Sequence, residues 1–163
     1  MLIQNILEGR DVLGVMPTGA GKSLCYQIPA LMMDGITLVI SPLISLMKDQ
    51  VSSLNQVGIL AAYINSSLTA AQYYKVLDLA RAGRYPIIYV APERLMSEDF
   101  LRFALSGQVK ISMVAVDEAH CVSQWGQDFR PSYLKIVDFI NQLPDRPVAV
   151  SYTHLTLPTI CSV

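Results

Sequence analysis

Residues 12–23 read Val-Leu-Gly-Val-Met-Pro-Thr-Gly-Ala-Gly-Lys-Ser, and this stretch sets the fold class. Its first five residues form a short apolar run, which is typical of a buried strand. A glycine-rich loop follows, and the helix predicted over Leu24–Met33 comes directly after it. Glycines let the backbone curl so that several N–H groups point at phosphate oxygens, and a helix N-terminus adds the positive end of its dipole. The stretch therefore predicts a phosphate-binding loop.

The predicted nucleotide-binding residues lie in the loop and at the start of the helix: Thr18, Gly19, Ala20, Gly21, Lys22 and Ser23. The Lys22 side chain can reach the β- and γ-phosphates of ATP, and the Ser23 hydroxyl can hold Mg²⁺. The strict pattern has Gly six residues before the lysine, where this chain has Met16. A glycine-rich turn that merely precedes a helix is the alternative interpretation, and Gly-Lys-Ser between a strand and a helix argues against it.

Further apolar segments, short and rich in β-branched or aromatic residues, predict strands on both sides of this loop. They are Val12–Met16, Ile36–Ser41, Ala61–Asn65, Ile87–Ala91 and Met113–Asp117, and Val148–Val150 begins a sixth. Helices are predicted over Leu24–Met33, Leu43–Val57, Thr69–Ala82, Arg94–Leu105 and Ser132–Leu143. Strands that alternate with helices predict a three-layer α/β domain with a parallel, doubly wound sheet. Ligands of such sheets bind at the carboxyl ends of the strands.

The fifth predicted strand ends in a second candidate for nucleotide chemistry, because Asp117 and Glu118 follow its apolar residues directly. An Asp in this position gives a phosphate-loop ATPase its second Mg²⁺ contact. A neighbouring carboxylate such as Glu118 can polarise the attacking water. An acidic helix cap is the alternative, and the upstream Lys22 makes it the weaker one. We expect Ser23 and Asp117 on adjacent strand ends, close enough to share one Mg²⁺.

The motifs resemble those of superfamily 2 helicases and, in particular, of the RecQ family. Residues 18–23 and 117–120 resemble motifs I and II of the superfamily, in which another residue replaces the first Gly. Residues 16–27, 41–50 and 91–95 are similar to the RecQ versions of motifs I, Ia and Ib. Residues 121–131 resemble the aromatic-rich RecQ loop that links DNA contact to ATP hydrolysis, although that family usually has His where Gln127 stands. The resemblance covers residues 4–150.

The resemblance implies a P-loop NTPase fold, namely the first RecA-like domain of a helicase, with ATP and Mg²⁺ as cofactors. It implies 3′-to-5′ DNA unwinding coupled to ATP hydrolysis, in DNA repair and recombination. The implied partners are DNA at a junction of single strand and duplex, and a second RecA-like domain. The implied catalytic residues are Lys22, Asp117, Glu118 and His120, with Ser23 and Asp117 as Mg²⁺ ligands. The implied DNA-coupling residues are Gln124, Trp125, Phe129 and Arg130.

The aromatic-rich loop also has a physical reason to meet DNA. Trp125 and Phe129 offer faces for base stacking, worth about 1–3 kcal/mol per base, and Arg130 can meet phosphate or stack. Packing under a loop is the usual role of an isolated Trp, but the position after Asp-Glu-Ala-His favours DNA contact. The net charge of −1 argues weakly against tight DNA binding by this chain alone. Lys48 suits either a DNA phosphate or a solvated helix face.

The composition fits one globular domain with a large core. Hydrophobic residues make up 52% of the 163 residues and charged residues 15%, as expected where parallel strands are buried on both faces. No apolar run reaches the ~18 residues that span a bilayer, and no signal peptide is recognisable. We therefore expect no membrane partner and a cytoplasmic location, at the nucleoid in a bacterium. The three cysteines form no C-x-x-C pair, which argues against a zinc site.

The two ends of the chain carry separate expectations. Residues 1–150 are expected to form the ATP-binding domain, and residues 151–163 an anomalous tail outside the fold, because residues 150–159 resemble a translated sequencing adapter. The second motor domain is expected to supply an arginine finger, so this chain alone should hydrolyse ATP negligibly. One hypothesis is therefore a helicase, and the other is a catalytically inactive nucleotide-binding chain. A phosphate-loop kinase would need an acceptor site that the sequence does not offer.

Overall fold

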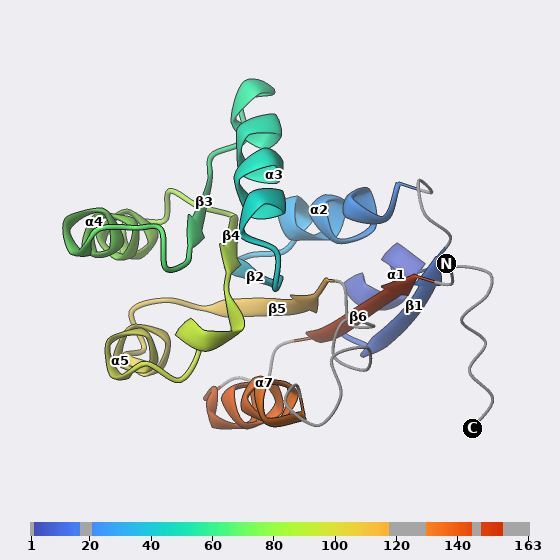
Figure 1. Cartoon of the computed structure of the whole chain (residues 1–163). Helices are drawn as coiled ribbons and strands as arrows, with labels where there is room; N and C mark the ends of the chain where they lie inside the picture. The colour runs from blue at the N-terminus through green and yellow to red at the C-terminus, as the bar shows by residue number, and fades with distance from the viewer. Residues whose placement is uncertain (1, 17–20, 118–129, 145–147, 155–163) are drawn as a thin grey trace.

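Six strands form one sheet in the computed structural model, which describes residues 2–16, 21–117, 130–144 and 148–154, the side chains of residues 16, 130–133 and 148–154 excepted. The sheet has the order β1-β6-β5-β2-β4-β3, and every neighbouring pair is parallel (Figure 1). The strands are β1 (Val12–Met16), β2 (Ile36–Ile40), β3 (Ala61–Ile64), β4 (Ile87–Val90), β5 (Ile111–Val116) and β6 (Val148–His154). The predicted parallel α/β fold is confirmed.

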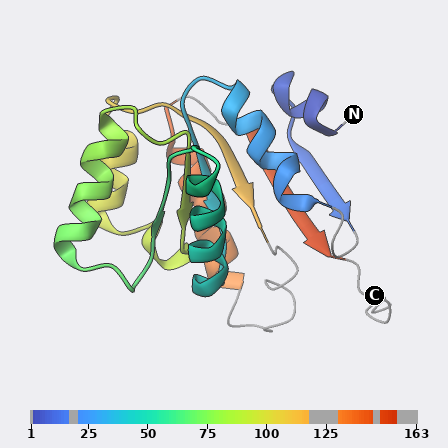
Figure 2. The same ribbon diagram turned by 90° about the horizontal axis from the view of Figure 1, so that it is seen from above.

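Helices cover both faces of the sheet and complete the three layers seen in Figures 1 and 2. They are α1 (Leu2–Leu7), α2 (Lys22–Met32), α3 (Ile44–Gln56), α4 (Ala70–Arg81), α5 (Glu98–Leu105) and α7 (Arg130–Gln142), with a short 3₁₀ helix η1 (Pro92–Arg94). Buried side chains of α1, α2 and α3 share one apolar core, and those of α4, α5 and α7 share the other. None of the described helices is long and apolar enough to cross a membrane.

Successive side chains of a strand point to opposite faces of the sheet, so one strand contributes to both apolar cores. All five residues of β2 are buried, and Leu38 joins the core under α4, α5 and α7 while Val39 joins the opposite one. The next strand in space, β4, divides its residues in the same way, with Ile88 and Tyr89 on opposite faces. Strands buried on both faces read as continuous apolar runs, which is why the sequence located them to within two residues.

Two helical expectations need correction. The short helix α1 was not expected, although its Ile6 is fully buried beside α2. The helix expected over Arg94–Leu105 is two elements, because η1 ends at Arg94 and α5 begins only after Ser97. Ser97 has extended backbone angles, and the first turn of α5 carries two acidic residues that favour a helix start there.

The expectation that the tail from Ser151 lies outside the fold is wrong for its first four residues. Strand β6 continues to His154, and its register with β1 runs from Val12 opposite Val150 to Met16 opposite His154. Since β6 is the one neighbour of β1 among the described strands, most of the pairing of β1 is with Ser151–His154. Backbone hydrogen bonds in a ladder depend little on side-chain identity, so a segment with no helical period can extend a strand. Residues 155–163 lie outside the described part of the chain.

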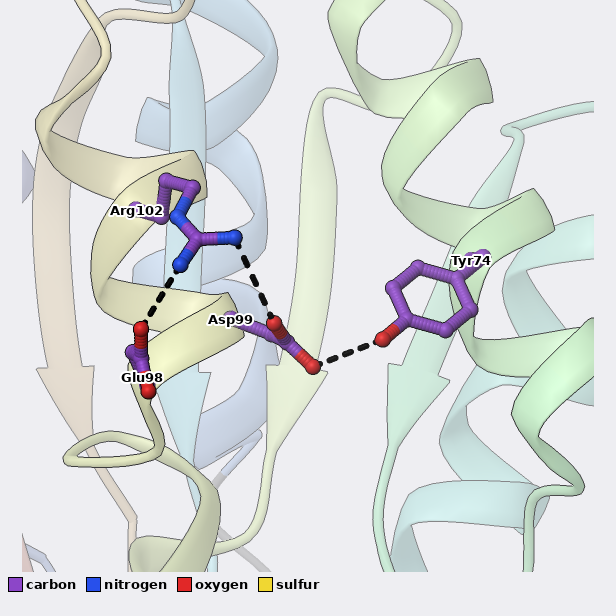
Figure 3. A network of polar contacts seen from close by, with 4 residues as sticks. All are labelled: Tyr74, Glu98, Asp99 and Arg102. Carbon is purple, nitrogen blue, oxygen red and sulfur yellow. Dashed lines mark hydrogen bonds and ion pairs between the residues drawn. The ribbon is translucent and has the colours of Figure 1, made fainter.

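Polar contacts on the surface join α4 to α5 (Figure 3). The Tyr74 hydroxyl donates to Asp99 Oδ2 at 2.7 Å, and this hydrogen bond raises the pKa of Tyr74. Arg102 pairs with Glu98 at 2.7 Å and lies 3.9 Å from Asp99. Helix α4 itself starts with a capping box between Thr69 and Gln72. These exposed contacts fix the outer helices rather than form a site.

Candidate functional site

Two elements far apart in the sequence meet at the carboxyl ends of the strands. Helix α2 begins at Lys22, shortly after β1, and Asp117 follows the last residue of β5. Lys22 Nζ lies 2.8 Å from Asp117 Oδ1, and the two side chains are only 10% and 4% exposed. A charge this deeply buried needs a partner of opposite sign. The ion pair therefore locks the start of α2 to the end of β5.

The N-terminus of α2 has a backbone that suits glycine. Gly21 stands before the helix with φ 68° and ψ 32°, in the left-handed region, which residues with a Cβ enter at a cost of about 1–2 kcal/mol. No side chain at this position caps the helix, and the first turn contains no acidic residue. The N–H of Leu24 bonds back to the Gly21 carbonyl at 3.0 Å, and a helix N-terminus without acidic side chains favours a bound anion.

Beneath this helix start lies a hydrogen-bonded group of four side chains. The hydroxyl oxygens of Tyr26 and Tyr89 are 3.2 Å apart. Gln27 Nε2 donates to Tyr89 at 3.2 Å and to Gln50 Oε1 at 3.1 Å. Burial raises the pKa of Tyr26 most, and Tyr89 and the negative charge of Asp117 raise it further, while a hydrogen bond with Ser23 acts in the opposite direction. The Tyr26 side chain is thus a neutral, protonated hydroxyl.

The described residues include only part of the predicted site. Gly21, Lys22, Ser23 and Asp117 are described, and the structure brings Lys22 and Asp117 together. Arg130 is the first residue of α7, and its side chain is not described. The remaining predicted residues lie outside the described part of the chain: Thr18, Gly19, Ala20, Glu118, His120, Gln124, Trp125 and Phe129. Lys48 is an exposed residue of α3, which leaves both of its interpretations open.

The expected placement of Ser23 and Asp117 on adjacent strand ends is wrong. Strand β6 separates β1 from β5 in the sheet, because the sequence order of the strands is not their spatial order. The two residues still belong to one region, since Lys22, the neighbour of Ser23 in the chain, pairs with Asp117 at 2.8 Å. Whether they share a cation stays a prediction.

Sequence reasoning missed the buried hydroxyl and amide groups under the site. Tyr26, Gln27 and Gln50 fall inside the stretches that carry the RecQ resemblance, but nothing in the pattern assigned them a role, and Tyr89 lies in a segment that reads as a plain buried strand. A tyrosine three residues after the loop serine, one turn further along the predicted helix, was the available signal.

This architecture and ion pair define a helicase-type nucleotide-binding domain, and comparison with known proteins agrees. Residues 1–155 match the family model described as DEAD/DEAH box helicase, so the chain belongs to the DEAD/DEAH box helicase family. It is similar to the ATP-dependent DNA helicase RecQ of Bacillus subtilis (strain 168), with 53% identity over 159 residues. The RecQ protein of Haemophilus influenzae (strain ATCC 51907 / DSM 11121 / KW20 / Rd) is 51% identical over 147 residues. The predicted RecQ resemblance is confirmed.

The coverage of these matches is asymmetric. The alignments include 97% and 90% of this chain but only 27% and 23% of the two relatives, so the chain spans about a quarter of their length. Among solved structures, the helicase MrfA bound to DNA has a TM-score of 0.70 with 20% identity, covering 96% of this chain and 22% of that one. At that identity the likeness concerns the fold alone.

Proposed function

We propose that this chain is the ATP-binding part of an ATP-dependent DNA helicase that couples ATP hydrolysis to 3′-to-5′ unwinding during DNA repair and recombination. The observation that carries the proposal is the buried ion pair of Lys22 and Asp117 at 2.8 Å. It unites the phosphate-loop lysine with the strand-end aspartate, the two groups that a phosphate-loop ATPase uses on its nucleotide and metal. The names of the relatives, which are ATP-dependent DNA helicases, supply the reaction and the DNA substrate.

The site residues divide the work by chemistry. The N-terminus of α2, entered through Gly21, and the loop residues Thr18, Gly19 and Ala20 would surround the phosphates with N–H groups. When ATP binds, Lys22 would leave its ion pair with Asp117 and contact the β- and γ-phosphates instead. Glu118, next to Asp117 in the sequence, would orient the attacking water, and His120 would complete the catalytic group as the family resemblance implies.

Magnesium fits the donors that this site offers. Ser23 and Asp117 provide a hydroxyl and a carboxylate oxygen, and Mg²⁺ uses one or two such protein ligands together with phosphate and water oxygens. No group of three or more His, Cys, Asp or Glu side chains able to hold a metal occurs among the described residues, which suits a cation held jointly with a nucleotide. Bound Mg²⁺ would neutralise negative charge between the β- and γ-phosphates.

DNA contact is assigned to the segment that follows Asp117. Trp125 and Phe129 would stack on bases, while Gln124 and Arg130 would provide polar contacts. We further propose a junction of single strand and duplex as the substrate, and a second RecA-like domain as the partner across the nucleotide. Residues 1–154, strand β6 included, would form the first such domain. Work on DNA would place the parent protein with the chromosome, at the nucleoid in a bacterium.

Nucleotide titration of two variants tests the binding site. Replacing Lys22 by Ala removes a charged donor to phosphate, worth about 1.5–3 kcal/mol, so ATP affinity measured by calorimetry with Mg²⁺ should fall about 10- to 150-fold. Lys75→Ala removes an exposed lysine on α4 and should leave the affinity unchanged. Equal affinities of wild type and Lys22→Ala would show that the loop is not the site.

A hydrolysis assay separates the two functional hypotheses. Release of phosphate that rises on addition of single-stranded DNA, and that Glu118→Gln abolishes, would support an enzyme. ATP binding without turnover in the presence of DNA would instead favour the catalytically inactive nucleotide-binding chain.

A further inference from the structure

The sheet ends at strand β3, whose outer edge no other described strand covers. Strand β3 pairs with β4 on one side, and helices α3 and α4 both contact it (Figure 1). A cavity of about 280 Å³ is lined by residues 61–63 of this strand together with side chains of α3 and α4. Because successive strand residues point to opposite faces of the sheet, a cavity that touches all three lies along the edge of β3. The edge is therefore the floor of a groove between the two helices.

The main chain of β3 presents hydrogen-bonding groups along this edge. The Ile64 carbonyl accepts from the N–H of Ala91, just after β4, at 2.9 Å, so Ile64 directs its main chain toward β4. Since the N–H and C=O groups of successive strand residues point to alternate sides, Tyr63 and Ala61 direct theirs away from the sheet. The Ala61 N–H donates to the Asn55 side chain at 3.0 Å, in agreement with that alternation. In the described part of the chain, no strand pairs with the N–H and C=O of Tyr63.

Apolar side chains and one cation surround these main-chain groups. Val51 of α3 and Val76 and Leu79 of α4 line the cavity. Lys75, also on α4, is its one charged lining residue and is exposed. None of the ion pairs between described residues involves Lys75. A ligand with a carboxylate and apolar side chains would match this combination, because opposite charges across an interface favour the correct partner.

We propose that the edge of β3 binds an extended acidic peptide of a partner protein, which would add a strand to the sheet. In this binding mode, main-chain hydrogen bonds supply affinity, and contacts of alternate side chains supply specificity. The peptide would exchange hydrogen bonds with the Tyr63 main chain and pair a carboxylate with Lys75. Its apolar side chains would pack against Val51 and Val76. A helical partner fits this edge less well, because its main-chain groups are bonded within the helix.

This surface is separate from the proposed nucleotide site. Strands β4 and β2 lie between β3 and β5, and Asp117 follows β5. Peptide binding at β3 therefore goes beyond the proposed function and does not depend on it. A partner held at β3 would leave access to the nucleotide site unchanged.

The test is fluorescence anisotropy of labelled hexapeptides with the full 163-residue chain. One peptide alternates valine with glutamate, and a second alternates valine with lysine. A third is the glutamate peptide with every main-chain nitrogen methylated, so that it cannot donate main-chain hydrogen bonds. We expect the glutamate peptide to bind with a Kd below about 1 mM. The lysine peptide and the methylated peptide should bind about tenfold more weakly or not at all.

Two charge reversals locate the binding site on the protein. Lys75→Glu replaces attraction by repulsion and should weaken binding of the glutamate peptide about 2- to 30-fold. Lys135→Glu reverses an exposed lysine on α7 and should leave the affinity unchanged. Both variants should unfold in urea with the wild-type midpoint, since both side chains are exposed. The comparison of the three peptides changes no residue of the protein, so it tests the proposal even if a variant folds poorly.

Each contrary outcome overturns the inference in its own way. Absence of saturable binding of the glutamate peptide would show that the edge takes no such strand. Equal binding of the methylated peptide would show that the main chain of β3 is not used. Equal affinity of wild type and Lys75→Glu would place the peptide elsewhere on the protein. Self-association of the chain that Lys75→Glu abolishes would assign the edge to a second copy in place of a partner peptide.

Discussion

A buried ion pair affects the stability of the fold in two opposite ways. It is tolerated while both charges are present, but either charge destabilises the fold when its partner is removed. In this structure, Lys22 and Asp117 satisfy each other with little help from solvent, at 10% and 4% exposure. Removing one member leaves the other charge buried without its partner, which typically destabilises a protein by about 3–5 kcal/mol, whereas replacing both members can be nearly neutral. The same residues that would bind nucleotide thus also hold the fold together.

The first prediction concerns this pair. Lys22→Met should lower the free energy of unfolding by about 3–5 kcal/mol, measured by urea denaturation without nucleotide. The double variant Lys22→Met with Asp117→Asn should recover a large part of the loss, because the uncompensated carboxylate is gone. If the double variant is less stable than Lys22→Met alone, the pair is not the dominant interaction of Asp117.

Among the helices and strands, the sequence predicted those whose local pattern agrees with their packing in the folded chain. Strands β2, β4 and β5 could be predicted because burial on both faces makes them continuous apolar runs, and α4 because Thr69 starts it and Gly83 follows its end. Helix α1 was missed although Gly9, with φ 78°, follows its end, because six residues are too few to show a helical period. The order of the strands could not be predicted either, because β1 and β6 are adjacent only through long-range pairing.

The candidate site was predicted unevenly for a related reason. Lys22, Ser23 and Asp117 carry local patterns, a glycine-rich loop and a strand-end carboxylate, that the sequence displays directly. The contacts of Tyr26 and Gln27 with Tyr89 join α2 to β4 through side chains whose local sequence is ordinary. Such contacts form only in the packed structure, and the hydrophobic periodicity of the sequence does not reveal them.

Strand β6 supports the second prediction. A chain that ends at Val150 loses the pairing of four β1 residues, Leu13 to Met16, with Ser151–His154. At about 0.5–1.5 kcal/mol for each of roughly four backbone hydrogen bonds, its free energy of unfolding should fall by about 2–6 kcal/mol. A chain that ends at His154 retains the pairing and is the matched control. Equal stability of the two truncated chains in urea would show that residues 151–154 do not pair with β1.

For the molecule as a whole, stability rests on two cores, one on each face of the sheet, and buried tyrosines occupy both. Burial is the main cause of a raised pKa for Tyr26, Tyr73, Tyr85 and Tyr89. In the unfolded chain these hydroxyls return to the ordinary pKa of 10.0. Above that pH the unfolded chain releases protons that the folded chain retains, so folding becomes less favourable.

The third prediction follows from this loss of stability above pH 10. The contribution of these tyrosines is fully present below pH 10 and is lost as pH rises above 10 toward their raised values. Urea denaturation at pH 8, 9, 10 and 11 should show a steeper fall of stability above pH 10 in wild type than in Tyr73→Phe. Since the variant removes one such group, the difference between the two curves isolates it from lysine and cysteine titration. Parallel curves would mean that Tyr73 ionises as freely in the folded state as in the unfolded one.

The position of β1 at the edge of the sheet, paired with β6 alone, has a consequence for synthesis on the ribosome. The strand that leads into the phosphate loop is translated more than 130 residues before β6, its one partner among the described strands. At roughly 5–20 residues per second, β1 waits on the order of ten seconds with its edges unpaired. A nascent chain of this kind exposes Leu13 and Val15, which are still 71% and 48% exposed in the finished fold. Holding by a chaperone, or a pause after the central strands have paired, would protect it until β6 arrives.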